Sequence, residues 1–213
     1  MVAVEEVEGL RERKKRATRL LISDTATRLF IARGFEQVTV EEIAIAANVS
    51  KMTVFNYFPR KEDLFFDRTE DVQQLLRSAL AGRGRRSPIA ALRDLAHGLV
   101  EQGHPVAKAN RDVASSWRAV AESPALRARA YDLLDEVEQE LGHMLAAAAA
   151  APADASLARL IAAMLLGAWR VAFGEALRRQ RSASAASVRA AFLELLDHGF
   201  AAASAAARGT PYA

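Results

Sequence analysis

The sequence of 213 residues is 51% hydrophobic, contains no cysteine and carries a formal net charge of +3. The apolar share is large enough to bury a core, and the lack of cysteine excludes disulfide frameworks, cysteine zinc sites and thiol nucleophiles. No run of about 20 uncharged apolar residues is present, and the first charged residues are acidic, unlike those of a signal peptide. We therefore expect a cytoplasmic protein without membrane association, built as one compact body with a small appended module.

The composition favours an all-α fold, because alanine, leucine and arginine are strong helix formers and alternating β-branched runs are almost absent. Helices are predicted over residues 11–33, 40–47, 51–58, 61–81, 89–102, 105–121, 124–150, 156–180 and 187–206. Gly34 ends the first helix, and Thr39 followed by Glu42 has the pattern of a capping box at the start of the second. Pro59 ends the third helix. About nine helices are expected, without a repeat of solenoid length.

Positive charge is concentrated near the N-terminus. Between residues 11 and 33 the sequence has only two acidic residues beside Arg11, Arg13, Lys14, Lys15, Arg16, Arg19, Arg28 and Arg33. Such a cluster is the electrostatic footprint of a phosphate-binding face, although a solvated basic helix end has the same pattern. A second basic run, residues 82–88, is interpreted as a flexible linker rather than an RNA-binding segment.

Residues 39–61 have the spacing of a helix-turn-helix, in which two short helices are joined by three or four residues. Its predicted small core consists of Ile43, Val49, Val54 and Phe58. Ala44 and Ala47 are small enough for a close helix crossing, and Asn48 tolerates the left-handed conformation expected at the turn. The side chains left to face outward are Lys51, Met52, Thr53, Asn56 and Tyr57. They are polar or aromatic groups able to reach base edges and phosphates.

This region resembles the tetracycline-repressor (TetR) family. The resemblance is carried by Phe30, Gly34 and Phe35, by Thr39-Val40, Ile43-Ala44 and Ala47-Asn48-Val49-Ser50, and by Thr53-Val54-Phe55-Asn56-Tyr57-Phe58, Lys61 and Leu64. The match is ordered and gap-free at one end of the chain. It implies that the third helix lies in the major groove of DNA. The predicted DNA-binding residues are Thr39, Ser50, Lys51, Met52, Thr53, Asn56, Tyr57 and Lys61.

The sequence departs from the family pattern at two positions, and two of the matching residues can also be explained without DNA contact. Asn48 replaces the usual turn glycine, which is a mild change for the reason given above. Phe55 replaces a tyrosine, so that hydroxyl is missing, and the ring is expected either to pack on a sugar or thymine methyl or to join the core. Lys61 alone is equally compatible with an ordinary helix start, and Tyr57 with a half-buried aromatic residue.

The resemblance also implies a division into a helix-turn-helix domain, residues 1–60, with residues 1–10 as a disordered tail, and a helical regulatory and dimerisation domain, residues 61–213. A homodimer is expected through about residues 156–206, where apolar stripes recur at helical spacing. The stripes are Leu160, Ile161, Met164, Leu165 and Ala168, and Phe192, Leu195, Leu196 and Phe200. Small residues, among them Ala158, Ala162, Ala163 and Gly167, are expected to let a second subunit approach, with Ala162 pointing outward.

Four bulky residues of the second domain, Trp117, Tyr131, Trp169 and Phe173, are predicted to line an apolar ligand pocket, with plain core packing as the alternative. The chain is then expected to be a repressor that a small, largely apolar ligand releases from a palindromic operator. The helix over residues 61–81 is the expected lever between the two domains. The alternatives are a regulator that acts without such a ligand, or an activator.

Enzymatic function is not expected, because the sequence has no glycine-rich phosphate loop, nucleophile elbow or paired-histidine motif. No cofactor and no metal are expected either, since His97, His104, His143 and His198 lie at no metal-ligand spacing. A pure interaction or RNA-binding protein is disfavoured by the helix-turn-helix spacing.

Overall fold

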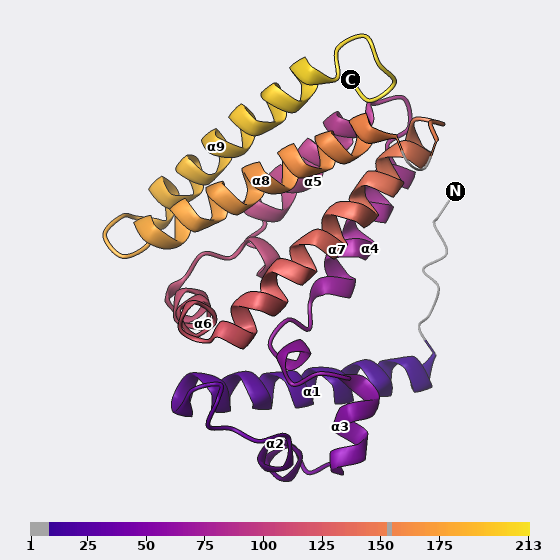
Figure 1. The fold of residues 1–213 in the computed structure, drawn as a ribbon. Helices are drawn as coiled ribbons and strands as arrows, with labels where there is room; N and C mark the ends of the chain where they lie inside the picture. The colour runs from indigo at the N-terminus through magenta and orange to yellow at the C-terminus, as the bar shows by residue number, and fades with distance from the viewer. Residues whose placement is uncertain (1–8, 153–154) are drawn as a thin grey trace. The chain divides into compact units, whose positions relative to one another are not determined.

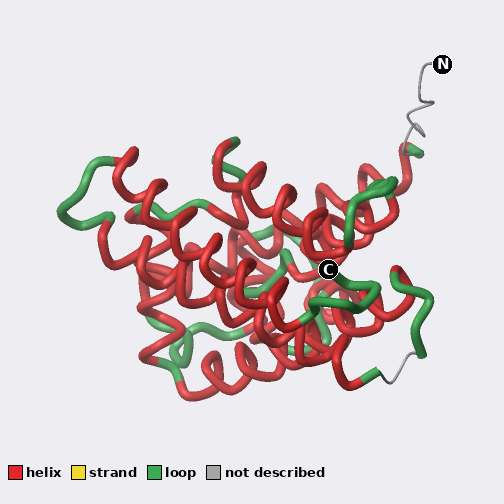
Figure 2. The backbone as a smooth tube through the Cα atoms, turned by 90° about the horizontal axis from the view of Figure 1, so that it is seen from above, coloured by secondary structure: helices red, strands yellow, loops and turns green. Residues whose placement is uncertain are grey.

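The computed structural model describes residues 9–152 and 155–213. Within these residues the secondary structure consists of nine α-helices and two short 3-10 helices without a strand, which confirms the all-α prediction (Figures 1 and 2). The chain divides into two compact units, Met1–Asp67 with Arg118–Arg129, and Arg68–Trp117 with Ala130–Ala213. The sequence suggested a single break near residue 60. Of the tail predicted over residues 1–10, residues 1–8 lie outside the described residues, and Leu10 already begins a helix.

The first unit contains α1 (Leu10–Arg33), α2 (Val40–Ala46), α3 (Lys51–Tyr57) and the 3-10 helix η1 (Glu62–Leu64). Its buried apolar side chains include Ile22, Ala26, Phe30, Ile43, Val54, Phe58 and Leu64. Helix α2 contacts both α1 and α3, and α1 also contacts η1. Of the predicted small core, Ile43, Val54 and Phe58 are buried and Val49 is partly buried, and α1 closes this core on a further side.

Local signals in the sequence account for the ends of these helices. Gly34 follows α1 with φ 86°, a conformation that glycine adopts without steric cost. Thr39 and Glu42 form both hydrogen bonds of the predicted capping box. Asn48 has φ 53°, as expected for the turn, and Ser50 caps α3 by accepting a hydrogen bond from the amide of Thr53.

The second unit contains α4 (Thr69–Ala81), α5 (Pro88–Glu101), η2 (Pro105–Ala107), most of α7 (Pro124–Ala148), α8 (Ser156–Arg179) and α9 (Ala185–Ala206). Helix α6 (Arg111–Glu122) begins in this unit and ends in the first. Helices α8 and α9 form the most extensive helix pair, and α5 packs against α9 and α4. Leu92, Leu145, Ile161 and Leu196 are among the buried residues of its core.

A close approach between α8 and α9 depends on Gly199. A Cβ atom added at Gly199 would lie 2.1 Å from the Cβ of Ala168, far inside van der Waals contact. The pairing of these two helices therefore requires a residue without a side chain at this position.

Two predicted helices are shorter than expected. The helix predicted over residues 61–81 begins at Thr69, because residues 62–68 form η1 and turns. Leu64 is buried there and the ring of Phe65 stacks at 6.2 Å from that of Phe30. The helix predicted over residues 105–121 is divided into η2 and α6, and the Asn110 side chain accepts a hydrogen bond from the Val113 amide at the start of α6.

Helix α8 is long and apolar enough to cross a membrane by length and composition, with a mean hydropathy of 1.5. An alanine-rich core helix has the same composition. Ile161, Leu165 and Ala172 of α8 are buried in the core of the second unit, while Arg159 and Arg170 interrupt its apolar sequence at exposed positions. These features fit a core helix with one apolar outer stripe.

Candidate DNA-binding surface and ligand pocket

Helix α3 presents one exposed face. Lys51, Met52, Phe55 and Asn56 are all exposed, and their spacing places them on the same side of the helix. Val54 and Phe58 point the other way and are buried. Phe55 is 41% exposed, so the interpretation that it joins the core is wrong and its ring belongs to the outer face.

The polar residues at the two ends of α3 are already hydrogen bonded within the unit. At the start, the hydroxyl oxygens of Ser50 and Thr53 lie 2.8 Å apart. At the end, the carbonyl of Tyr57 accepts a hydrogen bond of 3.2 Å from Nη1 of Arg19 on α1. The same guanidinium lies 4.6 Å from the centre of the Phe58 ring. Tyr57 is half-buried, as its plainer interpretation predicted.

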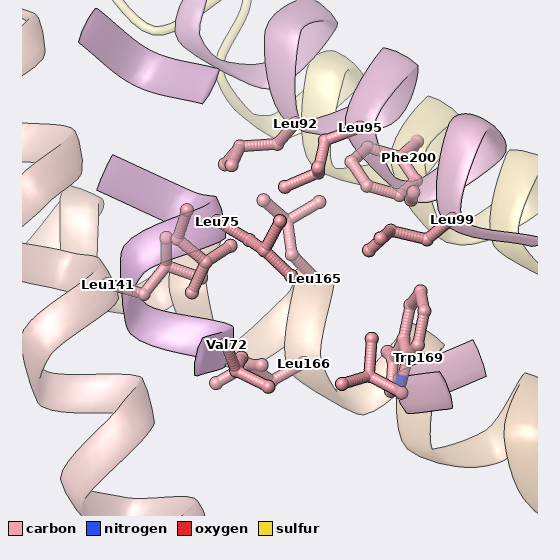
Figure 3. A pocket seen from close by; sticks show the side chains of 13 residues that line it. Val72, Leu75, Leu92, Leu95, Leu99, Leu141, Leu165, Leu166, Trp169 and Phe200 are labelled. Atoms are coloured by element: carbon pink, nitrogen blue, oxygen red, sulfur yellow. The ribbon is translucent and has the colours of Figure 1, made fainter. Parts of the chain in front are cut away.

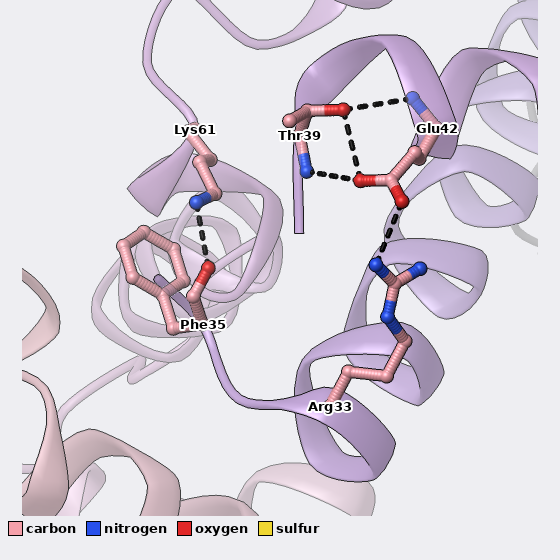
Figure 4. A network of polar contacts seen from close by, with 5 residues as sticks. All are labelled: Arg33, Phe35, Thr39, Glu42 and Lys61. Carbon is pink, nitrogen blue, oxygen red and sulfur yellow. Dashed lines mark hydrogen bonds and ion pairs between the residues drawn. The ribbon is translucent and has the colours of Figure 1, made fainter. Parts of the chain in front are cut away.

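A polar network fixes the start of α2 (Figure 4). The amide and hydroxyl of Thr39 donate to Oε2 of Glu42 at 2.8 and 2.9 Å, and Arg33 donates to its Oε1 at 2.7 Å. The backbone hydrogen bond from Thr39, followed by those from the Arg33 and Thr39 side chains, lowers the pKa of Glu42 to about 2. Glu42 therefore stays ionised, and its carboxylate links the end of α1 to the start of α2.

Lys61, which is predicted to contact DNA, makes contacts within the protein. Its Nζ donates a hydrogen bond of 2.6 Å to the carbonyl of Phe35 and lies 4.1 Å from the centre of the Phe35 ring (Figure 4). The Phe30 ring is 5.8 Å away. Burial lowers the pKa of Lys61. The ammonium thus ties η1 to the link between α1 and α2, and a phosphate contact has to compete with the Phe35 carbonyl.

The corner between α6 and α7 belongs to the same compact unit as the helix-turn-helix. Ser123 donates its hydroxyl to Oε1 of Glu36 at 2.8 Å, and Nε of Arg129 donates to Oδ1 of Asp63 at 2.7 Å. Leu126, between them, is fully buried. No local pattern in the sequence indicates these contacts, because the bonded residues are 87 and 66 positions apart.

The second unit contains an apolar pocket of about 160 Å³ (Figure 3). Its lining residues are Val72, Leu75, Leu76, Leu92, Leu95, Ala96, Leu99, Val106, Leu141, Leu165, Leu166, Trp169 and Phe200. None of these side chains is ionisable, and only the indole of Trp169 has a polar hydrogen. In Figure 3 the labelled side chains converge from several helices on a common space.

The pocket differs from the predicted one in three of four residues. Trp169 lines it, whereas Trp117, Tyr131 and Phe173 do not. The ring of Phe173 lies between those of Trp117 and Phe192, with centroid separations of 6.1 Å to each. Tyr131 is 71% exposed on α7. The lining comes instead from leucines that only the packing of several helices brings together.

An apolar groove of about 320 Å³ runs along the outer face of α8 and α9. It is lined by Met164, Gly167, Ala168, Val171, Leu195, Gly199 and Ala202. Leu160 and Val171, at helical spacing on α8, are each 53% exposed. The prediction that Ala158 and Ala162 face a second subunit is wrong, since both are fully buried in the core of the second unit.

Comparison with known proteins relates the N-terminal part of the chain to one family. Residues 22–67 match the family model described as bacterial regulatory proteins, tetR family. The chain is 31% identical over 143 residues to the HTH-type transcriptional regulator TcmR of Streptomyces glaucescens. That match covers 65% of this chain and 63% of TcmR, so it spans less than two thirds of that relative.

Solved structures share the fold. FadR of Thermus thermophilus, a TetR-family transcriptional repressor in complex with lauroyl-CoA, is 26% identical with a TM-score of 0.51, covering 85% of this chain and 94% of FadR. NalD of Pseudomonas aeruginosa, the secondary repressor of a multidrug efflux pump, is 20% identical with a TM-score of 0.56, covering 86% and 97%. The N-terminal helix-turn-helix of the chain therefore matches the tetR family of bacterial regulatory proteins, and its all-α fold is similar to that of a solved TetR-family repressor.

Proposed function

We propose that the protein is a transcriptional regulator that binds a palindromic DNA operator as a homodimer and is released by a small apolar ligand. The observation that carries the proposal is the exposed face of α3 inside a tetR-type helix-turn-helix. Repression is preferred to activation because FadR, the relative of similar fold with 26% identity, is a repressor. Acting on bacterial DNA, the regulator works in the cytoplasm.

The exposed face of α3 enters the major groove. Lys51 and Asn56 there have the donors and acceptors that read guanine and adenine edges, and Met52 and Phe55 offer apolar contact to thymine methyl groups. Thr39, Ser50, Thr53 and Tyr57 lie at the ends of α2 and α3, where hydroxyl and amide groups suit phosphate contacts. Lys61 reaches a phosphate only by sharing its ammonium with the Phe35 carbonyl.

Dimerisation covers the groove along α8 and α9. Val171 in the groove and Leu160 on the same side of α8 are both half-exposed, and a contiguous exposed apolar face marks an interaction surface. A two-fold axis lets the same face of two copies bury itself and closes the assembly after two subunits. Two helix-turn-helix domains related in this way read a palindrome, with half-sites about 34 Å apart or slightly more.

The ligand occupies the pocket of the second unit. An isolated buried charge costs several kcal/mol, so a pocket without ionisable or strongly polar side chains selects an uncharged apolar molecule. A cavity of roughly 150 Å³ lined by leucine, isoleucine and phenylalanine binds benzene. The pocket of about 160 Å³ is of that scale. The acyl chain of the lauroyl-CoA bound by FadR is also apolar.

Release requires that the ligand bind one shape of the dimer better than the other. The chain crosses between the two units before α4, within α6 and within α7. A shift in the pocket is therefore transmitted along three segments rather than along α4 alone. A preference of about 2.7 kcal/mol for the released shape lowers operator affinity roughly a hundredfold.

Selection of genomic DNA fragments on the purified protein tests the proposal. We expect recovery of a palindromic duplex that the protein binds in the presence of heparin, because specific base contacts outlast competition by a plain polyanion. Adding toluene is then expected to release the duplex, and adding benzoate of similar size is not. A protein that shows no preference for any duplex over heparin contradicts DNA regulation, and release by benzoate but not toluene contradicts the ligand class.

Trp169 gives a direct readout of the pocket. In a Trp117→Phe variant it is the remaining tryptophan, since the sequence contains two, and Trp117 is 43% exposed outside the lining. Toluene is expected to change the fluorescence of this variant at saturating concentration. An unchanged spectrum together with release of DNA would place the ligand elsewhere.

A further inference from the structure

The first turns of α1 are helical and exposed to solvent in the described part of the chain. Every residue from Gly9 to Ala17 is exposed, and the first buried side chain of α1 is Ile22. Five of the six side chains over residues 11–16, here called the basic arm, are cationic, with Glu12 as the exception. A helix that projects into solvent with this charge is not explained by the core of either unit.

The distribution of the cations indicates what the basic arm binds. At about 100° per residue, Arg11, Lys14 and Lys15 lie on one side of the axis and Arg13 and Arg16 on another. A membrane-surface helix needs an apolar stripe opposite its charges, and the arm has none. Cations on more than one side instead match a groove with phosphates on both walls, as in duplex DNA.

The basic arm lies on α1 a few residues before Arg19, which contacts the C-terminal end of α3. Arg19 of α1 contacts the Tyr57 carbonyl and the Phe58 ring at the C-terminal end of α3. From Arg19 the exposed part of α1 continues towards Leu10, past α3 in the view of Figure 1. At roughly 1.5 Å per residue this stretch is about 13 Å long. That length corresponds to about four base pairs at roughly 3.4 Å each.

We infer that the basic arm is a second DNA-binding site, which grips the phosphates of the duplex flanking each half-site. The inference rests on the proposed function, because it needs α3 to lie on DNA. It adds contacts that the helix-turn-helix does not make, and it assigns them to the side chains of residues 11–16. These contacts strengthen binding without reading bases, since phosphates carry no sequence information directly.

The test compares two variants of equal charge. The arm variant replaces Arg11, Arg13, Lys14, Lys15 and Arg16 with glutamine, which keeps helix propensity. The control variant replaces with glutamine five exposed cations of the second unit, Arg85, Lys108, Arg181, Arg189 and Arg208. Each variant is titrated with the selected operator in two lengths, one trimmed at the outer ends of the half-sites and one extended by about six base pairs on each side, beyond the reach of the arm.

On the extended duplex the arm variant is expected to bind roughly tenfold or more weakly. Its log–log salt slope should be shallower by up to about 0.9 for each phosphate that the arm no longer neutralises. On the trimmed duplex it should match the wild-type protein, and the control variant should match it on both. Equal affinity of arm variant and wild type on the extended duplex overturns the inference. Equal weakening on both duplexes, or an equal weakening in the control, also overturns it.

A third variant distinguishes the contribution of the basic arm from that of the residues before it. A protein lacking residues 2–8, which include Glu5, Glu6 and Glu8, is expected to bind the extended duplex at least as tightly as the full chain, because the five cations remain. Weaker binding by this deletion would assign the flanking contact to residues 2–8 instead. Failure of the wild-type protein to bind any duplex is a different result, which contradicts the proposed function itself.

Discussion

Nε of Arg129, near the start of α7, donates a hydrogen bond of 2.7 Å to Oδ1 of Asp63 in η1. The two side chains are 13% and 20% exposed, so the pair is largely shielded from water. Residues 118–129 form one compact unit with the helix-turn-helix, whereas α7 continues beyond Arg129 into the unit that contains the pocket. The pair therefore fastens the helix-turn-helix to a helix that continues into the second unit.

Breaking this pair should uncouple the ligand from DNA release more than it weakens DNA binding. A double-mutant cycle with Arg129→Gln and Asp63→Asn isolates the pair from the other contacts of Arg129, and we expect a coupling of about 1–3 kcal/mol in the free energy of unfolding. The single variants should bind operator while needing more ligand for release. Chemical denaturation and operator titrations measure the two effects. A coupling free energy of zero would show that the pair does not stabilise the contact between η1 and α7.

The polar network of Glu42 predicts a dependence of stability on pH. Its pKa is about 2 in the folded protein against an ordinary 4.5, so its stabilisation is complete above pH 4.5 and is lost as the pH falls towards 2. The melting temperature of Glu42→Gln should therefore lie below that of the wild type at pH 6, with a difference that shrinks on acidification. The control Glu41→Gln removes a carboxylate from the same turn outside the network. Parallel curves for the wild type and Glu42→Gln across this range would refute the assignment.

The close crossing of α8 and α9 predicts that one substitution restores the stability lost by another. Gly199→Ala places its methyl group against Ala168 and should destabilise the protein by about 1–3 kcal/mol through overpacking. Adding Ala168→Gly removes the obstructing methyl and should restore part of that stability. The control Gly98→Ala, whose added Cβ would meet its nearest neighbour at 3.7 Å, should be neutral or stabilising. If the double variant is less stable than Gly199→Ala alone, the crossing is not the cause.

The outer face of α8 predicts the oligomeric state. Val171→Glu places a charge at a position 53% exposed in one chain, so the subunit should fold while the dimer dissociates. Sedimentation at micromolar concentration should then show a monomer. Tyr131→Glu on α7, where the side chain is 71% exposed, should leave the dimer intact. Ala162→Glu is not a useful test, because a buried glutamate would unfold the subunit before it reported on the interface.

The structural features that depend on residues close together in the sequence could be predicted. The capping box of Thr39 and Glu42, the left-handed Asn48 and the Ser50 cap each involve residues within three positions of one another or a single backbone conformation. Periodicity also placed the helices. The turns over residues 62–68 were missed because Leu64 and Phe65 pack against α1, which no local pattern records.

Contacts between distant residues could not be predicted in the same way. Lys61 meets the Phe35 carbonyl across 26 positions, and one lysine in a family motif is compatible with either a phosphate or a carbonyl partner. Of the four residues predicted for a pocket, Trp169 alone lines the apolar pocket described above. Its leucines look like ordinary core in sequence, while Trp117 and Tyr131 are conspicuous by size and yet lie outside it.

The reading of bases by the exposed face of α3 is tested most directly by the ratio of the protein's affinities for the operator and for a mixed-sequence duplex. We expect the wild-type protein to prefer the operator by about a thousandfold or more. Lys51→Ala and Asn56→Ala, exposed positions whose substitution should not affect folding, are each expected to lower that preference by about 1–3 kcal/mol while binding the mixed-sequence duplex nearly as before. Wild-type affinity and preference in both variants would contradict the account.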